Sequence, residues 1–365
     1  MTAARYTTKL HEGDTRERLR AFWAGSSLGR PALNVIVRDP AAPPEPALPP
    51  KCGGNLKAAD LRADWQAART AHWLRAHRFL AEAMPGAHLL WGSHLATLPV
   101  LAGGDYEYQD SAWIKPLPGL PDRPLPAFDP DAAVVHALEA CYAAAAEPLR
   151  GQAFLTPPLM MDGLTTLSLF REPDQFCVDL LEQPELVKRW SGALTDLYIA
   201  AYEHFFHYLQ RLGVGGESIC FFGPLAEGRS EGVQCDCAVM LSPDMYREFV
   251  LPDLRRVTEY FDRSLYHLDG TCQMRFLDLL RSLPKLDGIQ WNPETTAGSP
   301  LRWLAAFREI RRRKFCLYIG CSVTEAVALT QELGPDGLFL SLPVCTSEAE
   351  AEAAIAAVTR AAQAR

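Results

Sequence analysis

Short apolar runs alternate with amphipathic stretches from about residue 87 to the C-terminus, and this alternation constrains the fold most strongly. Seven runs are nearly continuous in apolar residues, as is typical of strands covered on both faces: 87–92, 153–158, 218–223, 263–270, 286–291, 314–320 and 337–344. Helical patterns lie between them, near 134–147, 185–211, 243–262, 273–283, 299–313, 323–333 and 347–363. Repeated β–α alternation indicates an α/β fold with a parallel sheet, and seven or eight units favour a (β/α)8 TIM barrel. The open doubly wound sheet is the alternative, and the absence of a G-x-G-x-x-G motif after the first strand disfavours its dinucleotide-binding form.

The residues before this pattern predict an N-terminal helical extension. A helix is expected at 15–23, a proline-rich extended loop at 40–50, and a second helix at about 58–83. The chain is therefore divided into an extension and Pro-rich loop, 1–85, and a barrel, 86–365. The extension is too small to bury much apolar surface alone, so we expect it to pack on the barrel.

Composition disfavours several classes of function. Hydrophobic residues make up 48% of the 365 residues, which is sufficient for a large core. A formal charge of −8 without a stripe of Lys and Arg disfavours a nucleic-acid partner. No apolar run reaches the roughly 18 residues of a membrane span, and the N-terminus lacks the apolar core of a signal peptide. We expect a cytoplasmic protein without membrane contact, in which the ten cysteines stay reduced.

The strand ends of a parallel barrel carry its functional side chains, and here they hold thiols, an imidazole and carboxylates. The candidates are Cys235, Asp236, Tyr266, His267, Asp269, Gln290, Trp291 and Cys345. Cysteine, histidine and aspartate are zinc ligands, and a catalytic zinc has three protein ligands and one open position. Asp236 and Asp269 also suit general acid–base catalysis. Tyr266 and Trp291 would form apolar walls around a substrate.

These residue types have structural interpretations as well. A cysteine is often a small buried hydrophobe, and an aspartate at a strand end can cap the next loop. His267 could be a hydrogen-bonded histidine inside the barrel, and aromatic residues are more often part of a core than of a binding site. The residues alone leave both interpretations open.

Several segments resemble a known superfamily. CDCAVMLSPDMYREFVLPDLRRV (235–257) is similar to the Met-(Ile/Leu)-Ser-Pro signature, preceded by an aspartate, of the uroporphyrinogen-decarboxylase-like superfamily. SLYHLDG (264–270) with LPKLDGIQWNPE (283–294), and YEYQDSAWIKPLPG (106–119), are similar to blocks of its methyltransferase-like branch in the same order. The resemblance covers about residues 88–365. It implies a (β/α)8 barrel with its site at the carboxyl ends of the strands.

The resemblance also implies a zinc site. The methyltransferases of this superfamily bind zinc through a His-x-Cys pair and a distant Cys, and they use a corrinoid methyl donor. The histidine falls on His267 and the distant cysteine on Cys345, whereas the second position of the pair holds Asp269. A carboxylate gives a harder site than a thiolate. Asp269 and Cys235 are expected to fill the set, with Cys237 and Cys321 as alternative ligands. The arginine motif of the decarboxylase itself is missing from LGRPALNVIVR (28–38), which argues against that activity.

The sequence thus predicts a zinc-dependent alkyl- or methyltransferase that activates a thiol or similar soft nucleophile. The predicted residues are His267, Cys345 and Cys235 for zinc, Asp236 and Asp269 for catalysis, and Tyr266, Gln290 and Trp291 for the small-molecule substrate. A corrinoid, carried by a corrinoid protein as partner, would supply the methyl group. Two alternatives stay open: a metal-free acid–base enzyme of decarboxylase type, and a tetrapyrrole- or metal-binding protein without turnover. The oligomeric state is also open, with a homodimer among the states allowed.

Overall fold

A seven-stranded sheet lies at the centre of the computed structural model, which describes residues 6, 8–9, 14–45, 61–89, 94–108, 111–220 and 223–364. The strands are, in spatial order, β2 (His77–Ala81), β1 (Ala32–Arg38), β13 (Leu338–Ser341), β12 (Cys316–Gly320), β11 (Gly288–Asn292), β10 (Arg263–Asp269) and β9 (Ser230–Val233). Each neighbouring pair is parallel except β2 and β1, which are antiparallel. Because helices separate the parallel strands along the chain, the predicted α/β class is confirmed.

Three two-stranded sheets accompany the large one. β3 (Gly86–Ala87) and β6 (Phe154–Leu155) are parallel, whereas β4 (Tyr106–Tyr108) with β5 (Ala112–Ile114), and β7 (Glu217–Ile219) with β8 (Leu225–Glu227), are antiparallel. Within the described ranges, no ladder joins β3 or β6 to the seven-stranded sheet. Closure into a barrel therefore stays a prediction.

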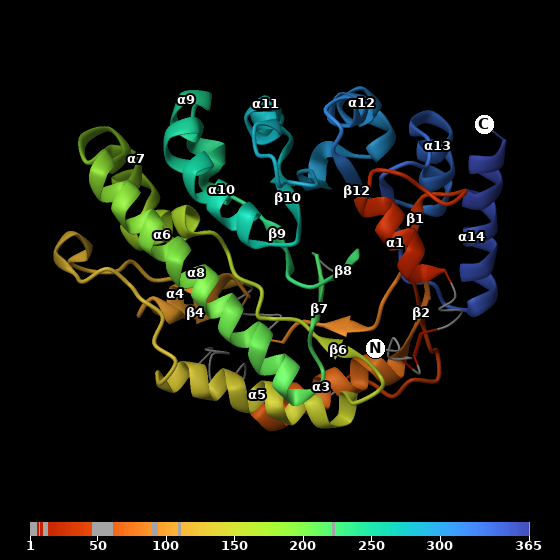
Figure 1. The fold of residues 1–365 in the computed structure, drawn as a ribbon, viewed down its shortest axis with the longest axis horizontal. Coiled ribbons are helices and arrows are strands. Elements are labelled where there is room, and N and C mark those ends of the chain that lie inside the picture. Colours follow the sequence, from red (N-terminus) through yellow and green to blue (C-terminus); the bar gives the residue numbers. More distant parts are fainter. Residues whose placement is uncertain are drawn as a thin grey trace.

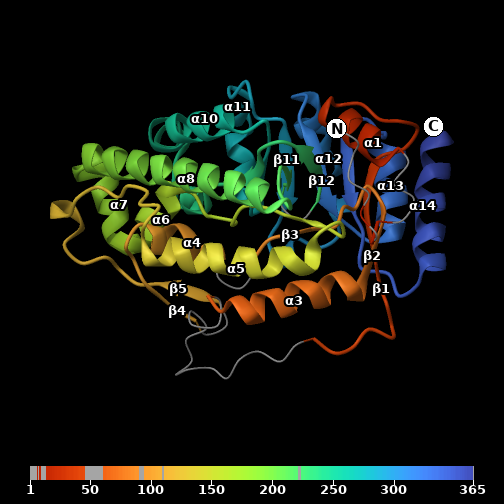
Figure 2. The same ribbon diagram turned by 60° about the horizontal axis from the view of Figure 1, so that its bottom comes forward.

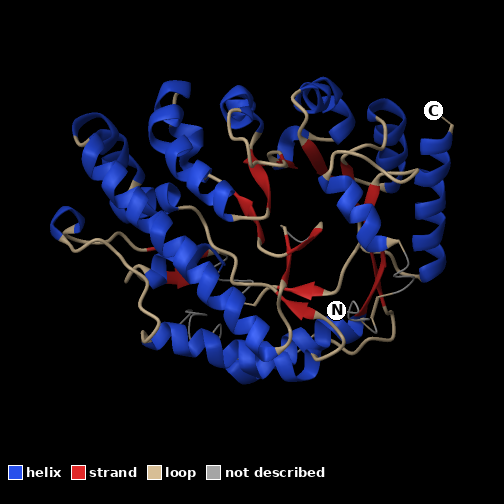
Figure 3. Ribbon diagram, viewed as in Figure 1, coloured by secondary structure: helices blue, strands red, loops and turns tan. Residues whose placement is uncertain are grey.

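Helices surround the strands (Figure 3). Figure 1 shows α10 to α14 in an arc on one side, with α3 and α5 along the opposite side. Figure 2 shows α3 lying beside α5. The helices are α1 (Thr15–Trp23), α3 (Ala63–Ala76), α4 (His94–Leu101), α5 (Ala133–Leu149), α6 (Gly163–Arg171), α7 (Pro173–Glu182), α8 (Pro184–Leu212), α9 (Pro243–Met245), α10 (Leu251–Tyr260), α11 (Leu277–Arg281), α12 (Leu304–Arg312), α13 (Val323–Leu333) and α14 (Glu348–Gln363). Short 3-10 helices include η3 (Asp236–Met240) and η5 (Thr271–Phe276), and a π-helical turn, η4 (Tyr246–Val250), precedes α10.

The N-terminal part of the chain contains two strands where the sequence predicted only helices and a loop. The helix expected at 58–83 ends at Ala76, where His77 takes an extended conformation, and β2 follows. All five residues of β2 pair with β1, and Phe79 and Leu80 are both buried. β1 itself pairs in parallel with β13, so the first 85 residues contribute two strands to the central sheet. The proline-rich segment lies partly outside the described residues.

A second difference concerns the strand that precedes Asp236. The apolar run at 218–223 predicted one strand there, but only Glu217–Ile219 is a strand, in the hairpin of β7 and β8. Residues 221–222 lie outside the described part. The strand that joins the central sheet is β9, whose sequence SEGV contains a buried glutamate and a glycine and therefore lacks an apolar pattern.

Alternation along the strands decides which side chains face the helices and which face the interior. Leu268, Ile289 and Leu340 face the helices and belong to the main hydrophobic core. The register places two rows of side chains on the inner face: His267, Gln290, Tyr318 and Phe339 in the first row, and Asp269, Asn292, Gly320, Ser341 and Asn34 in the second row. Below these rows, Leu265, Cys316 and Phe154 form a smaller apolar cluster that fills the interior. Polar groups are thereby confined to the carboxyl ends of the strands.

Candidate functional site

His267 is held at the carboxyl end of β10 by the neighbouring strand β11. Its Nδ1 hydrogen-bonds to Oε1 of Gln290, its partner in the register. Because an amide oxygen is an acceptor, Nδ1 carries the hydrogen of the neutral ring and Nε2 carries the lone pair. Nδ2 of Asn292, an amide donor, lies 3.4 Å from Nε2 of His267. The ring is thus fixed in one tautomer, with its basic nitrogen toward the second row.

Asp269 lies next to His267 on the same face of β10. Its Oδ1 accepts a hydrogen bond of 2.8 Å from Asn292 and lies 3.9 Å from Nε2 of His267. The Asp269 side chain is 44% exposed and the His267 side chain 17% exposed, so both reach the surface of the site. A carboxylate at this distance stabilises the protonated imidazole. His267 and Asp269, held in place by Asn292, suit proton transfer to and from a bound molecule.

Asp236 follows β9 at the start of η3, and its environment opposes ionisation. Burial, with the carboxylates of Asp162 and Asp269, raises the pKa of Asp236 to about 8. Its Oδ1 has no hydrogen-bond partner in the described part of the chain. The hydroxyl of Thr165 accepts hydrogen bonds from the Asp236 and Cys237 backbone amides and fixes this turn. At neutral pH Asp236 is therefore mostly protonated and suited to donate a proton.

Two residues that support Asp236 were missed in the sequence. Asp162 caps α6, where its carboxylate accepts from the Thr165 amide at 2.8 Å, and burial raises its pKa to about 6. An aspartate just before a helix is a recognisable N-cap signal, but nothing in the sequence shows that it approaches Asp236. Arg275 in η5 donates to the carbonyl oxygens of Ala238, Val239 and Leu241, at 3.3, 3.0 and 2.9 Å. This guanidinium fixes η3 to the segment after β10.

A cavity with a volume of about 570 Å³ opens on the inner face at β1, β12 and β13. Its polar lining includes Asn34, Tyr318, Ser341 and His88, and Nδ2 of Asn34 donates to Oγ of Ser341 at 3.0 Å. Its apolar lining includes Ile36, Trp73, Phe79 and Met84, so the first 85 residues supply much of the wall. The volume and the mixture of apolar walls with a few polar groups are typical of small-molecule sites. Tyr318 belongs to the same inner row as His267, two strands away.

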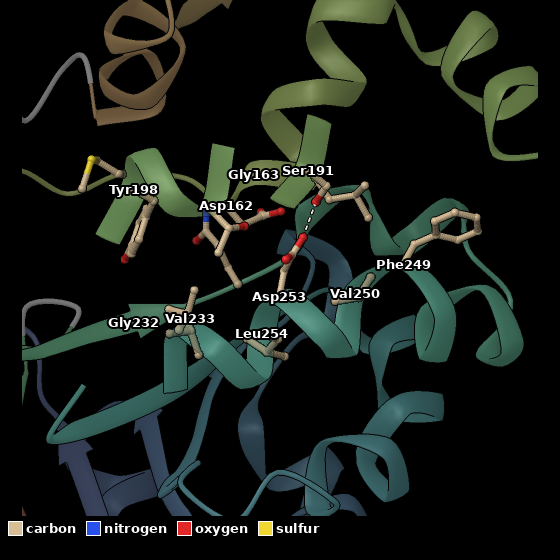
Figure 4. A pocket seen from close by; sticks show the side chains of 15 residues that line it. Asp162, Gly163, Ser191, Tyr198, Gly232, Val233, Phe249, Val250, Asp253 and Leu254 are labelled. Carbon is tan, nitrogen blue, oxygen red and sulfur yellow. Dashed lines mark hydrogen bonds between the residues drawn. The ribbon is translucent and has the colours of Figure 1, made fainter. Parts of the chain in front are cut away.

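A smaller cavity, of about 30 Å³, lies between α6, α8 and α10 (Figure 4). Asp162, Ser191 and Asp253 line it, and the Ser191 hydroxyl donates to Oδ2 of Asp253 at 2.6 Å. Burial raises the pKa of Asp253. The volume matches about one water molecule, so this cavity is too small for a substrate.

Tyr266 and Trp291, predicted as substrate contacts, lie on the other face of the sheet. Tyr266 is fully buried and donates to Oε1 of Gln273 at 2.7 Å. The Trp291 ring packs against Trp303 and Phe307, with centroid distances of 5.5 and 5.0 Å. Each directly neighbours an inner residue in sequence, and successive side chains of a strand point to opposite faces. The structure places both under the helices and only Gln290 of this predicted group at the site.

The three predicted zinc ligands are not brought together. Sγ of Cys235 lies 3.7 Å from Sγ of Cys237 in the hydrophobic core, and that thiol neighbour and burial raise the pKa of Cys235. Cys345 forms a bridge with Val37, on the helix-facing side, and burial raises its pKa. β11, β12 and β13 separate it from β10. No three His, Cys, Asp or Glu side chains in the described ranges are gathered closely enough to hold a metal ion. The donor set as arranged therefore does not fit zinc.

Comparison with known proteins supports the fold. No family model and no curated protein matches the sequence. The structure is similar to that of a methyltransferase from Methanosarcina mazei, with a TM-score of 0.58 and 15% sequence identity. The match covers 95% of this chain and 98% of the methyltransferase. The two chains share a fold over nearly their whole lengths. No helix among the described residues has the length and apolar character needed to span a membrane.

Proposed function

We propose that this protein is an enzyme that transfers a methyl or other alkyl group to a thiol or similar soft nucleophile. The observation that carries the proposal is His267, whose basic Nε2 is fixed by Gln290 and Asn292 on the inner face that also holds the large cavity. The shared fold with a methyltransferase agrees with this activity. Membership of the uroporphyrinogen-decarboxylase-like superfamily is part of the same proposal.

His267 would act as the general base. Nε2 takes the proton from the bound thiol, and Asp269 stabilises the resulting imidazolium from 3.9 Å. The thiolate sulfur then forms a bond to the methyl carbon of the donor. The bond between that carbon and the donor breaks, and its electron pair stays on the donor. The imidazolium finally returns its proton to water, so each turnover yields a methyl thioether and the demethylated donor.

Zinc and a corrinoid remain predictions from the sequence. No step above passes through zinc, because His267 and Asp269 supply two donors whereas Cys345 and Cys235 lie elsewhere. A corrinoid is the donor that the resemblance implies, and a corrinoid protein would then be the partner.

An acid–base enzyme of decarboxylase type is the second candidate. The specific observation in its favour is Asp236, whose raised pKa of about 8 supplies a proton donor at neutral pH. Decarboxylation leaves a carbanion that must be protonated, and His267 or Asp236 could deliver that proton.

Methyl transfer is tested with the full chain, methylcobalamin and a panel of small thiols, with thioether formation followed by mass spectrometry. We expect multiple turnovers with at least one thiol, and a loss of about 10²–10⁴-fold in His267→Gln, which cannot accept the proton. Metal content is measured on the same preparations. Carbon dioxide release from small carboxylic acids, without thioether formation, would favour the second candidate instead. One zinc per chain, lost in Cys345→Ala, would contradict the metal-free base.

A further inference from the structure

Gly320 interrupts the second inner row between the His267 cluster and the large cavity. The register places Gly320 beside Ser341, which lines the cavity, and on the other side beside the end of β11, where Asn292 contacts His267 and Asp269. Gly320 is exposed, whereas every other residue of β12 is buried. The second row therefore has a gap at the position between Asn292 and Ser341.

The gap is open space above the strand. Apart from Gly320 itself and its two chain neighbours, no described residue has an atom within 4 Å of the position that a Cβ would take at Gly320, and its φ lies in the region that L residues adopt. By contrast, a Cβ at Gly288 in β11 would lie 2.4 Å from the carbonyl oxygen of Cys316. Gly288 is thus required by close packing, whereas neither packing nor backbone conformation requires glycine at residue 320. A strand position without such a need normally favours a β-branched or aromatic residue.

We infer that Gly320 is the point over which the substrate extends from the cavity to His267, and that the substrate is an elongated molecule. This inference rests on the proposed function for the identity of the reacting end. Ser341 on β13 and His267 on β10 are three strands apart, which corresponds to roughly 14 Å across the sheet. A molecule with its body among Ile36, Trp73 and Met84 must span this distance for its reacting atom to meet Nε2. A side chain at residue 320 would occupy the connecting space.

Disulfide tethering tests the path without relying on turnover. Gly320→Cys is equilibrated with alkyl disulfides of increasing chain length under partly reducing conditions, and peptide mass spectrometry measures the adduct at residue 320. Chains that enter the apolar cavity gain burial with length, so the adduct equilibrium should rise about fourfold for each added methylene until the cavity is filled. The exposed thiols of Cys177 and Cys272 serve as internal controls and should show no dependence on length. Ser341→Phe, which fills the cavity side of the gap, should abolish the rise at residue 320.

Kinetic measurements form the second arm. Gly320→Leu should unfold at the wild-type temperature but lower kcat/KM at least tenfold, mainly through KM, for elongated thiols and less for short ones. Gly192→Leu, on α8, adds the same side chain where the nearest atom is Nη1 of Arg256 at 3.9 Å, and should leave kcat/KM unchanged. An adduct at residue 320 that does not depend on chain length would overturn the inference. A length-dependent adduct in a chain without methyl transfer would uphold the elongated-ligand path and reject the proposed function alone.

Discussion

Asp236 combines burial with two neighbouring carboxylates, and this combination predicts a defined pH dependence. Its pKa of about 8 leaves the carboxyl group protonated at neutral pH and ionised in alkaline solution. In the decarboxylase-type reaction, where Asp236 would deliver a proton, the rate falls as pH rises through about 8. For that reaction we expect Asp236→Asn to reduce kcat by about 10²–10⁴-fold with the fold intact. The measurement is kcat against pH, with thermal unfolding as the check on folding.

Asp244→Asn is the matched control for Asp236→Asn. Asp244 lies eight positions later, is 91% exposed and pairs with Arg247. It should keep wild-type activity. If kcat of Asp236→Asn stayed within a few-fold of wild type and still fell in the same way at alkaline pH, Asp236 would have only a structural role in its turn.

Glu231 predicts a pH effect on stability instead of on rate. The side chain is fully buried, Oε1 accepts from the Gly232 amide at 2.8 Å, and Oε2 has no partner in the described part of the chain. Burial raises its pKa from 4.5 to about 8. Between these two pKa values, Glu231 is ionised in the unfolded chain but protonated in the folded chain. The free energy of unfolding therefore falls as pH rises, and the loss is complete above about pH 8. The slope is about 1.4 kcal/mol per pH unit.

Glu231→Gln should remove this loss, because glutamine imitates the protonated acid and does not ionise. Urea unfolding should give the variant the stability of the wild type in mild acid and an advantage of a few kcal/mol at about pH 8. Glu352→Gln, at an exposed position of α14, should show no such trend. A difference between Glu231→Gln and wild type that stays constant with pH would contradict the assignment.

The site residues could be predicted as far as strand ends reveal them. His267, Asp269 and Gln290 follow from their positions and lie together. Tyr266 and Trp291 were grouped with them although each is one residue removed from an inner position, and the period of two places them under the helices. Asn292 and Asp162 act through contacts between distant segments, which residue type and spacing do not disclose.

At the scale of elements, η3 is held by Thr165 and by two side chains of η5, Gln273 and Arg275, of which Arg275 makes more hydrogen bonds. Another side chain cannot replace Arg275 here, because one nitrogen of its guanidinium donates to three carbonyl oxygens of the η3 segment. We expect Arg275→Gln to leave the unfolding temperature within a few degrees of wild type while lowering kcat of the decarboxylase-type reaction at least tenfold, since Asp236 is no longer held. The pH profile should flatten as well.

Arg255→Gln is the control for Arg275→Gln, since Arg255 donates to one carbonyl oxygen, of Ser282, at the surface. It should leave kcat and its pH profile unchanged. If Arg275→Gln lowered the unfolding temperature strongly with kcat preserved, Arg275 would have only a structural role.

Element prediction succeeded where local patterns decide and failed where pairing decides. The runs at 263–270, 286–291, 314–320 and 337–344 predicted β10 to β13 within a few residues, because these strands are covered on both faces and most of their side chains are apolar. β9 and β2 have no such pattern. SEGV becomes a strand because β10 offers a partner, and His77–Ala81 leaves its helix to pair with β1.

At the scale of the whole molecule, the first 85 residues belong to the central sheet and to the cavity wall. A chain beginning at Pro85 would lack β1 and β2 and would expose the edge of β13. We expect it to be poorly soluble and to lose the cooperative unfolding transition. A chain beginning at Asp14 keeps α1, β1 and β2 and should unfold cooperatively. Circular dichroism during heating distinguishes these outcomes, and wild-type stability of the shorter chain would show an independent barrel.

Because β1 pairs with β13, the central sheet can form completely only after the C-terminal part of the chain has been synthesised. Asn34 and Ser341 are hydrogen-bonded although 307 positions separate them. At the usual rates of translation, the ribosome needs roughly 15 to 60 s to add that length of chain. Throughout this time the apolar residues Leu33, Val35 and Val37 lack the strand that will cover their edge. The nascent chain therefore has an early hydrophobic segment whose edge is covered only after β13 has been made.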